Sequence, residues 1–349
     1  MKLILGGVRL LITLGTFVLA GLAVMALLGF AVPQFDLLNH FQVLLFLGTV
    51  FALILSLLVF GRGRWKRWVV GAASVGFLAS GVIFVPEVVG GFMPRDPLPT
   101  DSRPVLKLMT HNVFGLNFDM ARVQAVIDAE QPDIIALQEY FGEQSSELHP
   151  LLKSKYPYFA QCRGGKRANI AIYSKLPFEE AEEDGACPND AYGKQRTARI
   201  VATFKLSDST TFSVLTTHLD WPLPVARQTM QFEALSEAVK AAKGPLLVVG
   251  DFNSTPWSYA LRDFAMRSML DRQTRNLVTF PLRFTAPHRF FPDGLMDTFP
   301  LLPLDHVLTR GPIAVHTLHA APDTGSDHLP IVVTFSVTPA SLQPDCCKP

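Results

Sequence analysis

The hydrophobic pattern of this chain changes sharply about a quarter of the way along its length. The first part contains three apolar runs without a charged residue, Leu10–Val32, Val43–Phe60 and Trp68–Val85. Each run is about as long as a helix must be to cross ~30 Å of hydrocarbon. We therefore expect a membrane region at residues 1–92, with transmembrane helices at about 10–32, 43–60 and 68–85. A cleaved signal peptide is the alternative for the first run, but it would leave the next two runs unexplained.

After the third run the pattern becomes that of a globular domain. We expect a proline-rich linker at residues 93–103, a domain at 104–338 and a polar tail at 339–349. Within the domain, short apolar segments that are typical of strands alternate with segments of helical spacing. Strands are expected near residues 105–111, 133–138, 158–162, 170–174, 198–206, 212–218, 245–250, 304–308, 314–319 and 331–335. This pattern predicts an α/β fold in which two mixed β-sheets pack face to face with helices outside.

Basic residues around the apolar runs predict the orientation of the membrane region. Lys2 and Arg9 precede the first run, and the following loop, Pro33–Gln42, carries only Asp36. The second loop, G-R-G-R-W-K-R, is strongly basic. Because positive loops stay in the cytoplasm, we expect a multi-pass protein of the cell inner (plasma) membrane. The globular domain would then lie on the outer, periplasmic or extracytoplasmic, side.

Charge and cysteine content narrow the picture further. Beyond residue 96 the chain has 24 Lys and Arg against 27 Asp and Glu, so the outer domain is slightly acidic. Proteins that hold long nucleic acids through many phosphates are usually basic, which argues against, without excluding, such a role. Cys162 and Cys187 would face an oxidising compartment. They would either form a disulfide with each other or remain two free thiols. We assign no role to Cys346 and Cys347.

Polar residues stand at the ends of several predicted strands. Five apolar strands deliver a polar side chain at or just past their end, and a sixth strand follows such residues. They are Asn112, Glu139, His218, Asp251 with Asn253, Asp305, and Asp327 with His328 before the last strand. Sheets gather strand ends along one edge, so we expect these residues to converge on one cleft.

The chemistry of these side chains suits metal-assisted hydrolysis of a phosphate ester. Glu139 is the best candidate for a metal carboxylate, assisted by the amide oxygen of Asn112. A hard ion such as Mg²⁺ prefers such oxygen ligands. His328 needs a partner to fix its tautomer, and Asp305 is a good candidate.

The remaining residues would act on the phosphate and on water. Asp251 would orient or deprotonate the attacking water, Asn253 would hold a non-bridging phosphate oxygen, and His218 would stabilise the charge developing on phosphorus. Each residue alone has an ordinary explanation, since an Asn after a strand is often a turn residue. Six such elements in one domain make the joint ordinary explanation poor.

The ordered set of motifs resembles a known family. T-H-N, L-Q-E, T-H-L, G-D-F-N, L-D-H and S-D-H-L-P occur in this order over about Lys107–Phe335 and look like the endonuclease/exonuclease/phosphatase superfamily. The resemblance implies a four-layer α/β sandwich and Mg²⁺-dependent cleavage of phosphate esters by direct water attack, with Mn²⁺ as a possible substitute. It places Asn112, Glu139 and Asp327 at the metal and supports His328 as the catalytic histidine. It also supports His218, Asp251 and Asn253 at the phosphate, and Asp305 as an acidic site residue.

The chain departs from this family where an acidic residue of a central strand can support the first catalytic histidine. The corresponding segment, R-A-N-I-A-I-Y-S, offers only Asn169, so His218 would be held differently, or by Asp220. Asn169 is a candidate for substrate binding, as is Arg227, which opens a helix soon after His218. Other basic residues that would meet phosphate, or simply be solvated, are Arg163, Lys166, Arg167 and Arg196. Phe290 and Phe291 would contact substrate or pack in the interior.

Several functions remain open at this point. The leading one is a membrane-anchored, metal-dependent phosphoesterase, with nucleic acid or a lipid phosphodiester as substrate. A lipid would fit the membrane anchor, because tethering raises the effective concentration at a bilayer, but the sequence does not separate the two substrate classes. A binding module that keeps the fold without catalysis is the alternative from another class, and the intact set of polar residues argues against it.

Overall fold

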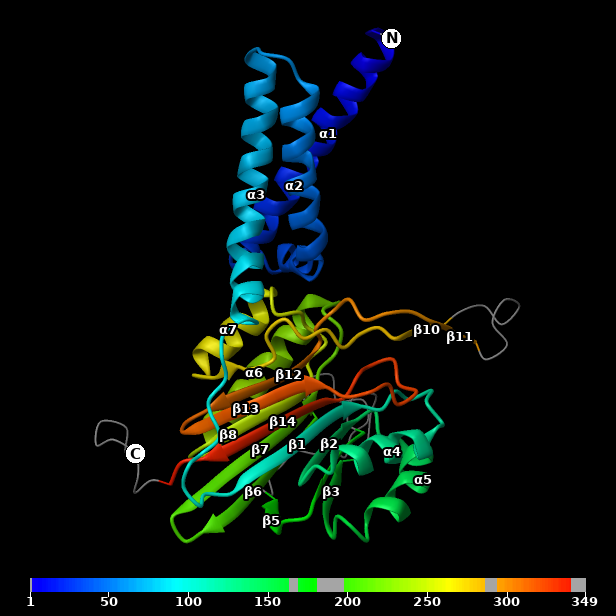
Figure 1. Ribbon diagram of the computed structural model, residues 1–349, viewed down its shortest axis with the longest axis vertical. Coiled ribbons are helices and arrows are strands. Elements are labelled where there is room, and N and C mark those ends of the chain that lie inside the picture. Colours follow the sequence, from blue (N-terminus) through cyan, green and yellow to red (C-terminus); the bar gives the residue numbers. More distant parts are fainter. Residues whose placement is uncertain (1, 163–168, 181–197, 286–293, 340–349) are drawn as a thin grey trace. The chain divides into compact units, whose positions relative to one another are not determined.

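The computed structural model describes residues 2–162, 169–180, 198–285 and 294–339, and the chain divides into two compact units. The first, which we call the helical unit, consists of Met1–Phe92 together with Thr255–Asp263. The second, the sandwich unit, consists of Met93–Ser254 and Phe264–Pro349. Figure 1 shows the long helices of the first unit and the sheets of the second.

Three long helices, α1 (Lys2–Leu27), α2 (Gln42–Val59) and α3 (Arg64–Gly90), form most of the helical unit. Two 3-10 helices, Leu28–Phe30 and Pro33–Phe41, connect α1 to α2, so most of the expected loop is helical. The long helices pack against one another, with small residues at their contacts. A Cβ on Gly76 of α3 would lie 2.9 Å from the Cα of Ala20 in α1, so the two backbones approach closely.

These helices are suited to a membrane by length and composition. In the described part of the chain, three segments are long and apolar enough to cross a bilayer: Leu3–Phe30, Pro33–Val59 and Arg64–Gly90. Many of their large apolar side chains are exposed, as Leu58 and Phe51 illustrate. A helix that exposes leucine and phenylalanine in this way suits a lipid environment, which indicates membrane association.

The sandwich unit contains two six-stranded sheets. The first contains β1 (Val105–Asn112), β2 (Ile134–Gln138), β3 (Tyr158–Cys162), β4 (Ile170–Ser174), β13 (Ile313–Ala320) and β14 (Ile331–Val337). The second contains β5 (Phe178–Glu180), β6 (Arg199–Ser207), β7 (Thr210–His218), β8 (Leu246–Asp251), β9 (Asp271–Arg272) and β12 (Asp305–Arg310). A separate pair, β10 (Arg283–Thr285) and β11 (Leu295–Asp297), forms a small antiparallel ribbon.

The two sheets share one plan. Their strand orders are β13-β14-β1-β2-β4-β3 and β5-β6-β7-β8-β12-β9. Each has one parallel pair near its centre, β1 with β2 and β7 with β8, while its other pairs are antiparallel. The parallel pairs place two carboxyl ends side by side in each sheet, which positions the candidate site.

Side-chain alternation along the strands builds the core. Leu108 of β1 joins the cluster between the sheets with Val214 and Val249, whereas Met109 points to the other face and joins Val123 and Ile127 of a covering helix. The helices of the sandwich unit are α4 (Met120–Glu130), α5 (Gly142–Leu152) and α6 (Val225–Ala241), and α7 (Tyr259–Arg267) ends in this unit. The predicted fold class, two mixed sheets packed face to face with helices outside, is confirmed.

Gly250 is the residue on which the end of β8 depends. Its φ is +136°, and a Cβ built on it would lie 2.0 Å from the carbonyl oxygen of Thr217 in β7. No side chain fits at that distance from a ladder carbonyl, so the parallel pair β7–β8 requires glycine at this point.

We expect Gly250→Ala to lower the free energy of unfolding by roughly 3 kcal/mol or more, because backbone must move to admit the methyl group. Gly142→Ala is the control, since a Cβ at that helical position meets nothing within 4 Å. Thermal unfolding of the detergent-solubilised protein measures both variants. Equal stability of the two would show that the β7–β8 pair tolerates a side chain.

Candidate active site

The strand ends of the first sheet bring four of the predicted residues to one edge. Asn112 ends β1 opposite Gln138 of β2, so Glu139 follows at the same edge. β14 runs antiparallel to β1 and begins with Ile331 opposite Thr110. Asp327 and His328 precede β14, and this register brings the segment that holds them to the edge where Asn112 lies.

The second sheet supplies the other three strand ends through its register. His218 at the end of β7 is paired with Asp251 at the end of β8, and Asp251 is paired with Asp305 at the start of β12. All three side chains are buried. Asn112 donates from Nδ2 to Asp251 Oδ2 at 3.0 Å, which joins the two sheets at this edge.

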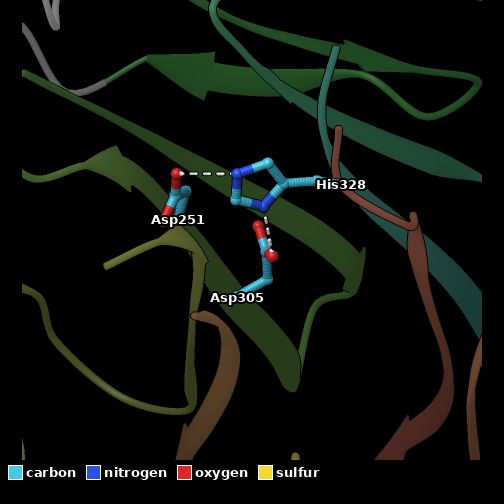
Figure 2. Close-up of side chains that lie close together, drawn as sticks. All are labelled: Asp251, Asp305 and His328. Carbon is cyan, nitrogen blue, oxygen red and sulfur yellow. Dashed lines mark hydrogen bonds and ion pairs between the residues drawn. The ribbon is translucent and has the colours of Figure 1, made fainter. Parts of the chain in front are cut away.

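His328 lies between two carboxylates, as Figure 2 shows. Its Nδ1 is 2.7 Å from Asp305 Oδ2, and its Nε2 is 3.7 Å from Asp251 Oδ2. Thr279 donates its hydroxyl to the same Asp305 oxygen at 2.5 Å. The ring of Phe280 packs against the imidazole with centroids 4.7 Å apart. The histidine is therefore fixed in orientation by one carboxylate and one aromatic ring.

The positive charge of His328 and the negative charges of the neighbouring carboxylates stabilise one another. Burial by itself would lower the pKa of His328, but the nearby carboxylates of Asp305 and Asp251 outweigh it and raise that pKa to about 10. Burial likewise opposes ionisation of Asp251, yet His328 and His218 hold its pKa well below the usual range. At neutral pH the cluster therefore contains a positively charged imidazole beside an ionised Asp251.

The turn after β8 fixes Asn253. Its φ is +46°, and its backbone N–H donates to Asp251 Oδ1 at 2.7 Å. Its side-chain Nδ2 donates to the carbonyl of Leu219 at 2.9 Å and lies 3.2 Å from Asp251 Oδ2. Asn253 Oδ1 is buried and accepts no hydrogen bond from the described residues. The side chain therefore offers the site an acceptor at Oδ1, and its expected hold on a phosphate oxygen stays a prediction.

His218 sits among the other site residues. Its Nε2 lies 3.5 Å from Asp251 Oδ2, 3.8 Å from Glu139 Oε1 and 3.4 Å from Asn253 Nδ2. Asp220, the alternative support for His218 in the sequence, has a carboxylate oxygen 3.7 Å from Arg227 Nη1. His218 Nε2 therefore lies close to the carboxylates of both Glu139 and Asp251.

Glu139 and Asp327 form the acidic side of the site. Glu139 has a φ of +53°, and its Oε2 accepts a hydrogen bond from the backbone N–H of Gly115 at 2.8 Å. Burial, followed by the negative charges of Glu139 and Asp251, raises the pKa of Asp327 to about 7. Asp327 Oδ1 is buried and has no hydrogen-bond partner among the described residues. An orphaned carboxylate oxygen beside a second acid fits a hard divalent cation.

A different trio, Asp251, Asp305 and His328, also has potential ligand atoms within 4.8 Å of one another. In this trio, Asp305 Oδ2 already accepts from Thr279 and His328, and Asp251 Oδ1 accepts from a backbone N–H. Its imidazole would also have to lose a proton before it could bind a metal. The acidic side of the site therefore fits a cation better than this hydrogen-bonded trio.

Comparison with known proteins agrees with this geometry. Residues 109–328 match the model of the Endonuclease/Exonuclease/phosphatase family, a stretch that includes every strand end of the site. The chain belongs to the endonuclease/exonuclease/phosphatase family. Members of this family hydrolyse phosphoric esters and generally depend on a divalent metal.

Individual relatives and solved structures are similar to parts of the chain or share its fold. The chain is 31% identical over 139 residues to the UPF0294 protein of Vibrio campbellii, a match that covers 40% of this chain and only 44% of that protein. An endonuclease/exonuclease/phosphatase from Beutenbergia cavernae has a similar fold, with a TM-score of 0.50, 21% identity and coverage of 67% of this chain and 72% of that one. A family protein from Bacteroides thetaiotaomicron has a TM-score of 0.52, 16% identity and coverage of 68% and 96%.

Asn169 and Arg227 stay candidates for substrate binding. Asn169 accepts a backbone hydrogen bond from Tyr140, the residue after Glu139, at 2.8 Å. Arg227 is half exposed on the first turn of α6, with the Asp220 contact given above. Other candidates, namely Arg163, Lys166, Arg167, Arg196, Phe290, Phe291, Cys346 and Cys347, lie outside the described residues. Cys162 is disulfide-bonded, and its candidate partner Cys187 also lies outside them.

Some residues that shape the site were not anticipated. Ser326 donates to the carbonyl of Asn112 at 2.6 Å and accepts from the backbone N–H of His328 at 3.0 Å. His306 is buried, with a pKa lowered by burial to about 3, and its Nε2 lies 2.8 Å from the carbonyl of Ser254. Both residues stand inside motifs, S-D-H and L-D-H, whereas no signal in the sequence marks Thr279.

We expect Ser326→Ala to lower the free energy of unfolding by about 2 kcal/mol, because it leaves a buried carbonyl and a buried N–H without a partner. Ser236→Ala is the matched control, since the buried Ser236 hydroxyl makes no hydrogen bond with the described residues. Thermal unfolding of the full chain in detergent measures the two. Comparable losses would mean that the Ser326 bonds contribute nothing specific.

Proposed function

We propose that this protein is a membrane-anchored, divalent-metal-dependent phosphodiesterase that acts outside the cytoplasmic membrane. The observation that carries the proposal is the convergence at one sheet edge of a charged His328–Asp305 pair, an ionised Asp251 and an acidic Glu139–Asp327 group. The three apolar helices support anchoring. The basic loop at Arg62–Arg67 supports a cytoplasmic position for that loop and an outer position for the hydrolase.

A cation would be held by Glu139 and Asp327, with Asn112 beside them. Asn112 Oδ1 accepts from the backbone N–H of Phe114 at 3.0 Å, which leaves this oxygen one lone pair for a cation. When bound, the ion would polarise the phosphate ester as a Lewis acid and neutralise its charge. Mg²⁺ suits these oxygen donors best, and Mn²⁺ is a reasonable substitute.

The protein side chains would handle water, protons and charge. Asp251 is ionised and buried, so it can accept a hydrogen bond, or a proton, from the attacking water. The free Oδ1 of Asn253 can orient the same water. The Nε2–H of His328 is 3.7 Å from Asp251 and 4.0 Å from Asp327, beyond hydrogen-bond length, so it is available to a phosphate oxygen. His218 would add a second donor to the charge developing on phosphorus.

We expect His328→Gln to lower kcat/KM for bis-p-nitrophenyl phosphate by about 10²–10⁴-fold, because the charged donor is lost. Glu139→Gln should raise the Mg²⁺ concentration needed for half-maximal rate and reduce turnover. The assay uses the full chain in detergent with Mg²⁺, Mn²⁺ or EDTA, and circular dichroism checks folding.

The matched controls are His319→Gln, an exposed histidine of β13, and Glu143→Gln, an exposed acid of α5, and both should keep wild-type rates. Retained activity in His328→Gln would remove this histidine from the mechanism. Activity that is unchanged in EDTA would contradict the metal dependence.

Within this function, a lipid phosphodiester is favoured over nucleic acid by the surface beside His328. Phe280, which contacts the imidazole, also packs edge to face against Trp221 with centroids 5.6 Å apart. Trp221 is 43% exposed and Leu223, two residues further on, is 65% exposed. An apolar rim next to the reacting centre suits a substrate with hydrocarbon near its phosphate. The acidic balance of the outer domain points the same way.

We expect Trp221→Ala to lower kcat/KM for a water-soluble short-chain phospholipid about tenfold, the equivalent of ~1.4 kcal/mol of lost apolar contact. Hydrolysis of bis-p-nitrophenyl phosphate should stay within twofold of wild type. Leu151→Ala, at an exposed leucine on α5, controls for loss of an apolar surface side chain away from the site. Cleavage of plasmid DNA but of no phospholipid by the wild-type protein would assign the site to nucleic acid.

A further inference from the structure

A buried acid of the helical unit caps a helix that begins in the middle of the hydrolase sequence. Asp36 Oδ2 accepts from the Ser258 hydroxyl at 2.8 Å and from the Ala260 N–H at 3.0 Å. Asp36 Oδ1 accepts from the Tyr259 N–H at 2.6 Å. These donors form the first turn of α7, whose N–H groups have no partner within the helix. The cap therefore comes from more than two hundred residues away in the chain.

Asp36 is itself held by a chain of buried amides. Asn39 Nδ2 donates to Asp36 Oδ1 at 2.7 Å and to the carbonyl of Ala26 at 3.0 Å. Gln42 Nε2 donates to Asn39 Oδ1 at 2.7 Å, and the Ser80 hydroxyl donates to Gln42 Oε1 at 2.8 Å. Ala26, Gln42 and Ser80 belong to α1, α2 and α3 respectively. The direction of the Asp36 carboxylate is therefore fixed by all three long helices.

The capped segment continues directly from the catalytic turn. Only Ser254 separates Asn253 from Thr255, the first residue of this segment in the helical unit. The Thr255 N–H and hydroxyl lie 3.3 and 3.2 Å from His40 Nδ1. On the other side of the turn, His306 holds the Ser254 carbonyl at 2.8 Å. The Ser254 carbonyl and the Thr255 N–H, which follow Asn253, therefore both have a histidine partner.

Aromatic contacts secure the same segment within the helical unit. Trp257 is 4% exposed and packs against Phe84 of α3 with centroids 5.9 Å apart. Tyr259 packs against Phe30 at 6.3 Å. A buried carboxylate is costly to desolvate, so its presence beside this apolar packing calls for a more specific purpose.

We propose that Asp36 is a positioning residue that sets the place of the Asp251–Asn253 turn by capping α7. Its effect on turnover rests on the proposed phosphodiesterase function. Loss of the cap would let the first turn of α7 loosen, and the shift would pass through Thr255 and Ser254 to Asn253. Asn253 and Asp251 contact the reacting atoms in the proposed mechanism, so a displacement of even ~1 Å would slow the chemical step.

The test compares Asp36→Ala, Asp36→Asn and Ser258→Ala in the full chain in detergent. Ser56→Ala is the control, because this buried hydroxyl of α2 donates only to Ala52 of its own helix, at 2.6 Å. We expect Asp36→Ala to lower kcat for bis-p-nitrophenyl phosphate about tenfold or more, with KM within about twofold. Asp36→Asn, which keeps one acceptor oxygen, should retain part of the activity. Ser258→Ala, which removes one donor to Asp36, should show a smaller loss of kcat and remains informative if Asp36→Ala does not fold.

Hydrogen exchange of peptides covering residues 250–262 gives a second readout, which does not depend on enzymatic activity. Exchange should become faster in Asp36→Ala and stay unchanged in Ser56→Ala. Unchanged exchange in this segment overturns the inference, as does faster exchange with an unaltered kcat, because Asp36 would then be only an anchor. A wild-type protein that hydrolyses no phosphodiester would contradict the proposed function, while the exchange result still decides whether Asp36 orders residues 250–262.

Discussion

The burial of charge at the strand ends is the constraint on which the rest of the site depends. Glu139, Asp251, Asp305 and Asp327 lie at one edge with His218 and His328, and most of these groups are buried. An ionised group out of water costs several kcal/mol unless opposite charge and hydrogen bonds compensate it. His328 provides that charge to Asp305 and Asp251, and hydroxyl and amide groups satisfy the remaining lone pairs. The site therefore behaves as one electrostatic unit, in which each orienting contact is also a contribution to stability.

The charged side chains reach the site because the backbone turns sharply just past the ends of the strands. In a strand, successive side chains point to opposite faces, so a polar residue within the ladder would enter a core. Glu139 and Asn253 adopt left-handed conformations just past β2 and β8, with φ of +53° and +46°. Such conformations cost about 1–3 kcal/mol each for residues other than glycine. Hydrogen bonds from the Gly115 N–H to Glu139, and from the Asn253 N–H to Asp251, offset part of that cost.

The fold class and the residues at the strand ends could be predicted because each rests on a local pattern. An apolar run followed by a polar residue marks both a strand and its end, and this pattern indicated Asn112 and Asp251. The orientation of Asn253 could not be predicted, because it depends on the Leu219 carbonyl of another strand end. Thr279 carries no signal, since a single threonine in a loop has no periodicity. Asp36 was expected in a plain loop because its partners lie far away in the sequence.

Asp36 and Asp251 show two ways of keeping a buried carboxylate, and the difference bears on what the anchor does. Asp251 is balanced by charged histidine within the hydrolase. Asp36 relies on hydroxyl and N–H donors, three of which come from residues 258–260. Without that segment Asp36 would keep only the hydrogen bond from Asn39 and lose the other three, a state that desolvation makes unfavourable. An interchangeable anchor would have no reason to bury this acid. The helical unit is therefore complete only with residues 255–263, a segment that follows the Asp251–Asn253 turn directly in the sequence.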